Sequence, residues 1–342
     1  MHAKTFLLLF FLLLTGCVPA AALPTPTASA LPTLAQTATE IPPTSTVIPN
    51  PTETPTLTPE PTETPEPTLI PVEVTQVLEI VEANGPLSLP DGIAISPDGF
   101  VYVLDAGNQR VVKLSPDGEF ILAWGQGFRF LDFSGLNVDQ EGNVYVVDNG
   151  NDRVQKFDAE GNFLLAFGEP GFGEGQFDRA IDVVIDAEGN IFVTDDHNPF
   201  VQKFDAAGNF LFRWGGAGRE EGQFEHVTGI AIDADGNIYV ADYEASRIQK
   251  FTSEGEFITQ WRASRPDGIT IDAAGRVYVT EYNAGQIKVF SSEGELLAAW
   301  GKKGTDAGEF QYPAGIAVDA DGFVYVTDDQ NNRVQKFEIK WP

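Results

Sequence analysis

GIAIDADGNIYVADYEASRIQKFTSEGEFITQW, residues 229–261, is the stretch of sequence that decides the fold. It contains four short runs of mostly apolar residues, and residues typical of turns separate them. Apolar runs of this length, bounded by Gly, Asp, Glu and Ser, predict β-strands joined by tight turns. We therefore expect a four-stranded antiparallel meander, with strands at 229–233, 237–241, 247–251 and 256–261.

The same pattern recurs along the chain in six copies, spaced by roughly forty to forty-seven residues. Sheets of this kind are apolar on both faces, so neighbouring copies must stack against one another. Radial stacking predicts an all-β fold, a six-bladed β-propeller of four-stranded antiparallel blades. A small residue suits the first strand, because six innermost strands crowd around one axis. This first-strand position is occupied by Gly92, Gly135, Asp182, Gly229, Gly268 and Gly315.

The last copy ends after its third strand, at residues 333–341. The segment TQVLEIV at 75–81 precedes the first copy and has the composition of the missing strand. Pairing the two ends of the domain in one blade removes an exposed sheet edge. We therefore expect the N-terminal strand to complete the last blade and close the ring.

The N-terminus has the features of an export signal. Lys4 precedes the apolar run 6–14, which is too short to span a bilayer. The sequence Leu-Thr-Gly-Cys at 14–17 follows and resembles the lipobox of bacterial lipoproteins. The resemblance implies that residues 1–16 are removed and that Cys17 becomes the lipidated N-terminus. A plain secretory signal is the alternative.

Residues 17–73 carry this cysteine and then a segment rich in Pro and Thr. Such a composition predicts a disordered stalk between a lipid anchor and the propeller at 74–342. We expect the protein to lie in the bacterial cell envelope, facing outside the cytoplasmic membrane and touching it through the anchor only. Cys17 is the only cysteine, so no disulfide can form within the chain.

Two recurring positions have structural explanations. The turn between the first two strands, Asp-Ala-Asp-Gly at 233–236, resembles the opening of a calcium loop but lacks the downstream bidentate Glu. A hairpin turn with Gly at positive φ explains it better. The aromatic residue that ends the fourth strand is expected to pack between blades rather than to stack on a ligand. It is found as Trp124, Phe167, Trp214, Trp261 and Trp300.

A third recurring position is the acid that ends the second strand, followed five residues later by arginine. The two side chains lie at opposite ends of one tight turn and can share a charge-assisted hydrogen bond. We expect these pairs to act as structural clamps, and as exposed pairs to contribute only ~0–1 kcal/mol each. The pairs are Asp105 with Arg110, Asp148 with Arg153, Asp242 with Arg247, and Asp328 with Arg333.

Three sequence elements together resemble the NHL repeat. They are Gly-Ile-Ala-Val-Asp at 315–319, Tyr-Val-Thr-Asp at 325–328 and Asn-Asn-Arg-Val-Gln-Lys-Phe at 331–337, with related copies throughout 87–342. The resemblance implies a six-bladed propeller. It does not imply an activity, because this fold serves enzymes, RNA-binding proteins and protein-binding modules.

The loops between strands two and three, and the segments leading into strand one, emerge at the same end of a propeller. Residues there differ between the repeats, as a binding surface on a rigid ring requires. The candidate binding face consists of Asp132, Arg179, Asp182, Asp196, His197, His226, Tyr243, Arg265, Tyr282, Tyr312 and Asp329.

The third repeat departs most from the pattern. Asp182 replaces glycine, His197 lies where other repeats approach their arginine, and Asp195 therefore has no arginine partner. If His226 joins them from the next repeat, these four side chains form a candidate site for Zn²⁺ or Ca²⁺. The alternative is ordinary drift between repeats, in which case no cofactor is expected.

The charge of the domain excludes one class of function. The sequence holds 50 acidic and 21 basic residues; six acidic residues and Lys4 precede residue 74, which leaves 44 acidic and 20 basic residues in the propeller. Such an excess repels phosphate backbones, so we expect no nucleic-acid partner.

Two classes of function remain. The first is a monomeric, membrane-tethered module that binds a protein, peptide or glycan. The second is a propeller lyase or hydrolase, either metal-dependent or metal-free, with its site at the channel mouth near the third and fourth blades. Peptide-amidating lyases share an NHL-like fold but use three zinc-binding histidines, and this domain has only His197 and His226. No catalytic motif is present, which favours the binding module over an enzyme.

Overall fold

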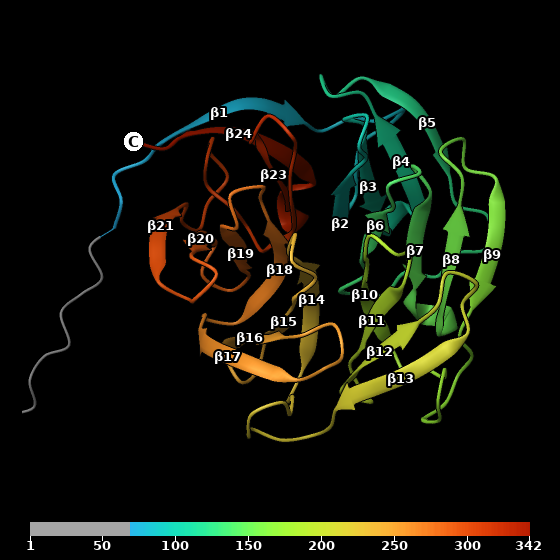
Figure 1. Cartoon of the computed structure of the whole chain (residues 1–342). Coiled ribbons are helices and arrows are strands. Elements are labelled where there is room, and N and C mark those ends of the chain that lie inside the picture. Colours follow the sequence, from blue (N-terminus) through green and yellow to red (C-terminus); the bar gives the residue numbers. More distant parts are fainter. Residues whose placement is uncertain (1–68) are drawn as a thin grey trace, which may run out of the picture. The chain divides into compact units, whose positions relative to one another are not determined.

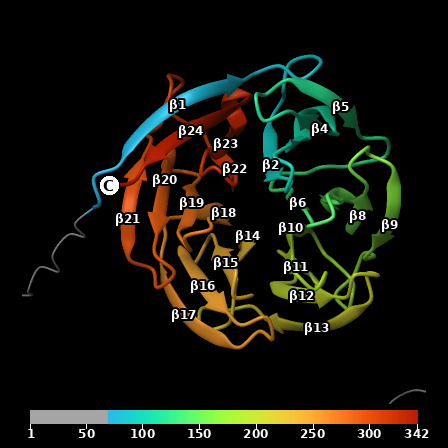
Figure 2. The same ribbon diagram turned by 45° about the horizontal axis from the view of Figure 1, so that its top comes forward.

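The computed structural model describes residues 69–342, and these residues form a six-bladed β-propeller (Figures 1 and 2). The signal peptide, Cys17 and nearly all of the predicted stalk lie outside the described residues. Within residues 69–342 the secondary structure consists of β-strands and three short 3₁₀ turns. The prediction of an all-β propeller is confirmed.

Each blade is a four-stranded antiparallel sheet whose first strand lies innermost (Figure 2). The first three blades are β2 (Pro90–Ile95), β3 (Val101–Asp105), β4 (Arg110–Leu114) and β5 (Phe120–Trp124); β6 (Leu136–Val138), β7 (Val144–Asp148), β8 (Arg153–Phe157) and β9 (Phe163–Phe167); and β10 (Ala180–Ile185), β11 (Ile191–Asp195), β12 (Phe200–Phe204) and β13 (Phe210–Gly215).

The remaining blades follow the same plan, and the sixth borrows its outer strand from the N-terminal end of the domain. They are β14 (Val227–Ile232), β15 (Ile238–Asp242), β16 (Arg247–Phe251) and β17 (Phe257–Arg262); β18 (Pro266–Ile271), β19 (Val277–Glu281), β20 (Gln286–Phe290) and β21 (Leu296–Trp300); and β22 (Pro313–Val318), β23 (Val324–Asp328), β24 (Arg333–Lys340) and β1 (Glu73–Ile80). The 3₁₀ turns η1 (Ala106–Asn108), η2 (Asn149–Asn151) and η3 (Asp329–Asn331) connect second and third strands.

Strand β1 closes the ring by pairing antiparallel with β24, from Glu73 opposite Lys340 to Ile80 opposite Val334 (Figure 1). Side chains of β1 alternate between exposed and partly buried, and Ile80 at its end is only 4% exposed. The predicted closure by the N-terminal strand is confirmed.

The innermost strands approach one another as closely as the glycine pattern predicts. A Cβ atom added to Gly315 would lie 2.6 Å from the carbonyl oxygen of Asp91, and one added to Gly92 would lie 2.8 Å from that of Ser134. Hydrogen bonds connect adjacent blades at this level, such as Gly92 N–H to the Ser134 carbonyl at 3.1 Å. Glycine is therefore required by the contact between neighbouring blades.

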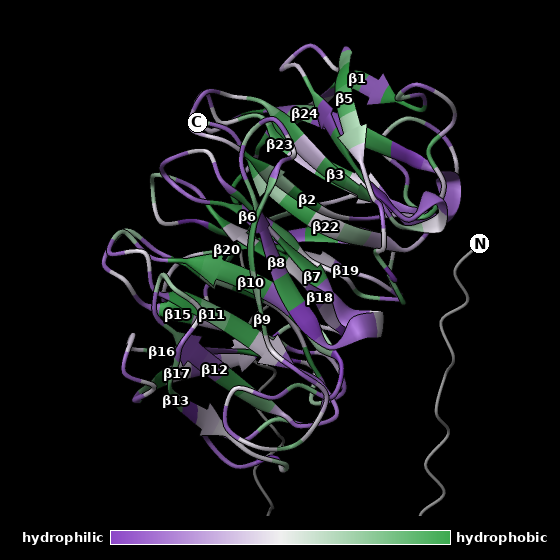
Figure 3. Ribbon diagram, turned by 90° about the vertical axis from the view of Figure 1, so that its right-hand side faces the viewer, coloured by the Kyte–Doolittle hydropathy of each residue, from purple (hydrophilic) through white to green (hydrophobic). Residues whose placement is uncertain are grey.

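The hydrophobic core consists of separate clusters between neighbouring blades, and Figure 3 shows the apolar residues gathered in the stacked strands. The fourth-strand aromatics lie in these interfaces, since Trp124 packs against Phe157 of the next blade at 5.8 Å and Trp214 against Phe251 at 6.0 Å between ring centroids. Their packing role explains why they recur.

The turn between the first and second strands is a hairpin that uses its own carboxylate. Asp233 accepts hydrogen bonds from the N–H groups of Asp235 and Asn237, and Gly236 has a φ of 82°. This geometry supports the hairpin interpretation over a calcium loop. Among residues 69–342 no helix is long and apolar enough to cross a membrane.

Candidate functional site at the channel mouth

The mouth is the end of the channel where the loops between second and third strands meet the segments that lead into the first strands. Several lead-in residues have left-handed backbone, including Arg179 with φ 72°, Arg265 with φ 47° and Tyr312 with φ 63°. Left-handed conformations of large side chains carry strain and gather at functional sites. In every repeat except the second and fourth, a residue with left-handed backbone lies three positions before the first-strand landmark.

Two cavities meet at the mouth. The upper one, of about 560 Å³, is lined by loop and lead-in residues that include Asp132, Arg179, Tyr282 and Asp329. The lower one, of about 190 Å³, follows the channel between the innermost strands. Phe133 lines both cavities, so its ring stands at the boundary between them.

Phe133 reaches across the mouth from the second blade. Its ring centroid lies 5.5 Å from that of Tyr282 in the fifth blade and 6.0 Å from that of Tyr243 in the fourth. Its backbone is left-handed, with φ 61°, because β6 begins late and the lead-in of this blade is shifted by one residue. Asp132, which was predicted for the binding face and is exposed, therefore does not occupy the place that Arg179, Arg265 and Tyr312 have in their repeats.

Tyrosines and a histidine complete an aromatic cluster around Phe133. The Tyr282 and Tyr312 rings form a tilted pair with 4.9 Å between centroids, and the His226 ring lies 5.4 Å from that of Tyr243. The Tyr282 hydroxyl lies 3.5 Å from a carboxylate oxygen of Asp329. We call these five residues, Phe133, His226, Tyr243, Tyr282 and Tyr312, the aromatic cluster; they present ring faces and hydroxyl groups at the mouth.

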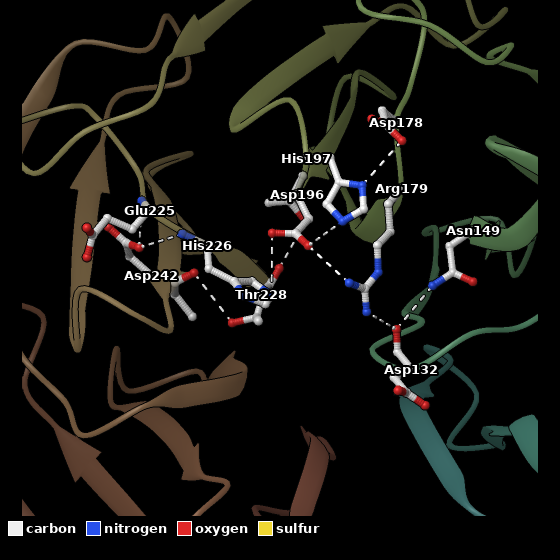
Figure 4. A network of polar contacts seen from close by, with 12 residues as sticks. Asp132, Asn149, Asp178, Arg179, Asp196, His197, Glu225, His226, Thr228 and Asp242 are labelled. Atoms are coloured by element: carbon white, nitrogen blue, oxygen red, sulfur yellow. Dashed lines mark hydrogen bonds and ion pairs between the residues drawn. The ribbon is translucent and has the colours of Figure 1, made fainter.

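Asp196 is the centre of a polar network beside this cluster (Figure 4). Its carboxylate lies 3.3 Å from Arg179 Nη1, 3.4 Å from His226 Nε2 and 3.8 Å from His197 Nε2. Burial raises the pKa of Asp196, and the neighbouring His226 and Arg179 oppose that rise. The His226 Nε2 atom is buried and makes no hydrogen bond among the described residues, and the nearest carboxylate oxygen is that of Asp196 at 3.4 Å.

The predicted clamp pairs are in contact in all four blades. Arg110 contacts Asp105, and the other Nε to Oδ2 distances are 2.8 Å for Arg153 and Asp148, 3.1 Å for Arg247 and Asp242, and 2.8 Å for Arg333 and Asp328. All four carboxylates are 0% exposed. The expectation that these pairs are exposed, with the small energy of surface pairs, is therefore wrong, because the turn covers each acid.

Two blades replace the arginine in different ways. Asp195 accepts from the amide of Asn198 at 3.3 Å and from the backbone of Asp178, and burial raises its pKa to about 8. Glu281 instead contacts Lys288 Nζ at 2.9 Å. The third blade thus keeps a buried acid with neutral partners where the other five blades keep an ion pair.

The structure does not bring the predicted metal ligands together. Asp182 accepts from the N–H of Val183 and, at 3.1 Å, from that of Ile230, so it bridges two blades. His197 is an exposed side chain beside Asp178, whereas Asp195 is fully buried beneath the loop. Within residues 69–342 no group of three or more His, Cys, Asp or Glu side chains could hold a metal ion.

Carboxyl groups of alternate blades line the channel instead. Asp91 of β2, Asp182 of β10 and Asp267 of β18 all border the lower cavity. Burial raises the pKa of Asp91 to about 8 and that of Asp182 to about 7. Burial also raises the pKa of Asp267 well above its usual range, and repulsion from Asp91 and Asp182 adds to the effect.

The residues of the predicted binding face are therefore divided among the two cavities, the aromatic cluster and the polar network, with Arg265 apart from them. Asp132, Arg179, Tyr282 and Asp329 line the upper cavity and Asp182 the lower one. His226, Tyr243 and Tyr312 belong to the aromatic cluster, and Asp196 with His197 to the polar network beside it. Arg265 is half-exposed, with its guanidinium 5.5 Å from the Tyr243 centroid and near Glu244.

Sequence reasoning missed Phe133, Asp91 and Asp267. A signal for Phe133 exists, because the other repeats have Pro, Ala or Val two positions before the first-strand landmark, where the second repeat has this Phe. The two acids lie one position before that landmark, where other repeats have Ser, Ile, Thr or Ala. Asp91 and Asp267 could have been noticed because each places an acid beside the crowded axis of the propeller, where other repeats have no charge.

Comparison with known proteins supports the repeat assignment. The NHL repeat profile matches residues 87–114, 224–251 and 310–337, which span the first three strands of the first, fourth and sixth blades. The chain is thus a six-bladed β-propeller that contains NHL repeats. No curated protein matches its sequence.

Solved structures share the fold at low sequence identity. A streptogramin B lyase is 17% identical, with a TM-score of 0.58, and the match covers 79% of this chain and 98% of that one. A gluconolactonase from Xanthomonas campestris is 17% identical, with a TM-score of 0.60 and coverage of 80% and 95%. A catalytically inactive virginiamycin B lyase from Staphylococcus aureus, solved with quinupristin, is 16% identical, with a TM-score of 0.56 and coverage of 80% and 89%. At these identities the likeness concerns the fold.

Proposed function

We propose that this protein is a binding module, tethered by a lipid anchor outside the cytoplasmic membrane, that takes a peptide, protein segment or glycan at the channel mouth. The observation that carries the proposal is the upper cavity of about 560 Å³, with residues of five blades in its lining. A concave site with apolar walls and a few convergent polar groups is typical of ligand binding.

The chemistry of the lining supports recognition. Phe133 and Tyr282 provide ring faces, while Asp132, Arg179 and Asp329 provide charged groups around them. Aromatic residues with a polar tip bury large areas at low entropic cost and are frequent at interfaces. The polar network at Asp196 holds Arg179 in place, so part of the site is preorganised.

The tether belongs to the same proposal. Its basis is the lipobox-like sequence ending at Cys17 and the Pro- and Thr-rich segment that follows. Two or more acyl chains give a stable anchor. Replacing Cys17 with Ala should release the protein from the membrane fraction, whereas an unchanged membrane association would contradict this part of the proposal.

A thermal-shift screen of short peptides and oligosaccharides tests the binding role. A ligand that binds the folded state raises the melting temperature in proportion to the logarithm of its concentration. The shift should be lost in Tyr282→Ala and kept in Phe163→Ala, since Phe163 is a 58% exposed aromatic residue on the outer strand β9. A shift that survives Tyr282→Ala would contradict binding at the mouth.

An enzyme remains the second candidate, because Asp182 and Asp91 line the channel with pKa values of about 7 and about 8. A carboxyl group with a pKa near the working pH is suited to general acid–base catalysis. The structural neighbours that are named as lyases and as a gluconolactonase favour this candidate at the level of the fold only.

Turnover assays distinguish the two candidates. A propeller lyase or hydrolase should open quinupristin or a simple sugar lactone. Asp182→Asn should abolish turnover in protein that circular dichroism shows to be folded; some loss of stability is expected, because Asp182 accepts from two backbone N–H groups. Absence of turnover with both substrates, together with a ligand found in the thermal-shift screen, would favour the binding module.

A further inference from the structure

We infer that the mouth recognises an organic cation, an alkylammonium group of the kind that a lysine side chain presents, held between Asp267 and the aromatic cluster. This inference rests on the proposed binding function and names the chemical class of the ligand.

The first observation is a buried carboxylate without a partner. Asp267 is 5% exposed and borders the lower cavity, and its Oδ2 atom is buried with no hydrogen-bond donor in reach among the described residues. An unsatisfied buried acceptor is costly, and a charged donor removes that cost. Asp91, by contrast, accepts from the Ser134 N–H at 2.6 Å.

The second observation is the distribution of charge around the mouth. The arginines at the mouth have carboxylate partners of their own, Arg179 at Asp196 and Arg265 at Glu244. Lys303 lies 5.8 Å from the Tyr312 ring centroid and Arg179 5.9 Å from that of Phe133. Within residues 69–342, no ion pair shorter than 4.0 Å includes Asp91, Asp267 or Asp329. Several carboxyl groups thus face the cavities without a counter-charge. Burial and mutual repulsion raise the pKa of Asp91 and of Asp267, and a ligand that brings one positive charge would favour the ionised form of the carboxyl group it contacts.

The third observation is the aromatic cluster above these acids. The Tyr282 ring centroid lies 4.9 Å from that of Tyr312 and 5.5 Å from that of Phe133, both as tilted pairs, and Phe133 borders both cavities. An ammonium group within about 6 Å of such faces is attracted by the ring quadrupoles, most strongly when water is excluded. Aromatic faces with nearby carboxylates are suited to ammonium groups.

The geometry favours an organic cation over a metal ion. A divalent ion needs several oxygen ligands converging on one point, and no such group exists in the part of the chain that is described. An alkylammonium group needs one or two carboxylates and an apolar wall for its methylene groups. Phe133, which borders both cavities, provides such a wall at the level of the mouth.

Isothermal titration of the full-length protein tests the inference. The probe is N-α-acetyl-lysine amide, and its neutral control is N-α-acetyl-norleucine amide. Cadaverine represents a small free amine, and CaCl₂ and ZnCl₂ represent inorganic cations. We expect the lysine amide or cadaverine to bind and the norleucine amide not to bind. Tighter binding of the lysine amide identifies a peptide source, and tighter binding of cadaverine a free amine.

Three variants locate the site. Asp267→Asn keeps the shape of the side chain and should weaken amine binding at least tenfold. If that variant fails to fold, Tyr282→Leu serves in its place and should also weaken binding. The control is Asp321→Asn, an exposed acid in the turn between β22 and β23, which should leave binding unchanged.

Four outcomes overturn the inference: no binding of either amine, equal binding of the neutral norleucine amide, full affinity in Asp267→Asn or Tyr282→Leu, or binding of an inorganic cation alone. A neutral peptide or glycan that binds at the mouth while amines do not would overturn the cation and leave the proposed function standing. If no ligand of any class binds, both fail.

Discussion

Replacing Arg333 with Met should destabilise the propeller more than the same change at Arg153. Both arginines contact a fully buried acid through Nε at 2.8 Å. The acids are also matched, because Asp148 and Asp328 each keep a backbone N–H, an Asn amide and a Gln amide as donors after the change. The difference therefore lies in the arginines.

Arg333 is the more deeply engaged of the two. Its side chain is 7% exposed, and Nη2 donates to the carbonyl groups of Asp306 at 3.0 Å and Glu309 at 2.9 Å, while Nη1 approaches Glu79 of β1 at 3.3 Å. It thereby joins the last blade, the closing strand and the segment that precedes β22. The Arg153 side chain is 35% exposed, so water can replace much of its contact.

Breaking a buried ion pair costs about 3–5 kcal/mol, so we expect about 3–4 kcal/mol for Arg333→Met and ~1–2 kcal/mol for Arg153→Met. Urea denaturation followed by circular dichroism measures both, provided that the slope with denaturant is unchanged. Each kcal/mol should also lower the melting temperature by about 2–4 °C for a domain of this size. Equal losses for the two variants would refute the reasoning.

Three further predictions concern the channel and the ring. Burial raises the pKa of Asp91 to about 8, so the folded protein keeps a proton that the unfolded chain releases near pH 4. The stabilising contribution of Asp91 is therefore present at low pH and lost as pH rises through about 8. Asp91→Asn should flatten this fall in the free energy of unfolding by up to about 1.4 kcal/mol per pH unit, and an unchanged pH profile would contradict the shift. Gly315→Ala places a Cβ 2.6 Å from a backbone oxygen and should cost a few kcal/mol, whereas Gly173→Ala meets a flexible glutamine side chain and should cost under about 1 kcal/mol in the same denaturation assay. Ile80→Ala should cost about 2–5 kcal/mol because it empties a buried site beside the last blade, while Val77→Ala, at a 45% exposed position of the same strand, should stay within about 0.5 kcal/mol; similar losses would argue against closure by β1.

The architecture could be predicted because the strand pattern within one repeat, the number of repeats and the missing last strand all indicated the same fold. Six copies fixed the number of blades, and the missing strand after Arg333 pointed to residues 75–81, close to the observed β1. The strands expected within 229–261 differ from β14, β15, β16 and β17 by at most two residues at either end. A repeated local pattern leaves few alternative folds, because every copy must pack against its neighbours in the same way.

The site was predictable only in part. Residues that vary on a common rim, such as Arg179 and Tyr282, could be named from their place in the repeat. Their contacts could not, because Phe133 reaches across the mouth only when β6 begins late. The burial of the clamp acids was missed for a similar reason. Repeat position says which end of a turn a carboxylate occupies but not how deeply neighbouring blades cover it.

The side chains proposed as metal ligands are directed at other partners in the structure. Asp182 and His226 lie in adjacent repeats, yet Asp182 is directed at the Ile230 N–H and His226 at Asp196. The same substitution that suggested a ligand therefore serves contact between blades. An acid that replaces glycine beside a crowded axis has backbone donors within reach, and these satisfy it.

Hydrogen–deuterium exchange with and without a bound ligand tests the central claim most directly. If the mouth is the binding site, a ligand from the screen or the titration should protect the loops at 106–109, 243–246 and 282–285 and the lead-in segments at 131–134 and 312–314. The turns at the opposite end, such as 233–236 and 319–322, should exchange at unchanged rates. Protection confined to those turns or to the outer strands would contradict the account.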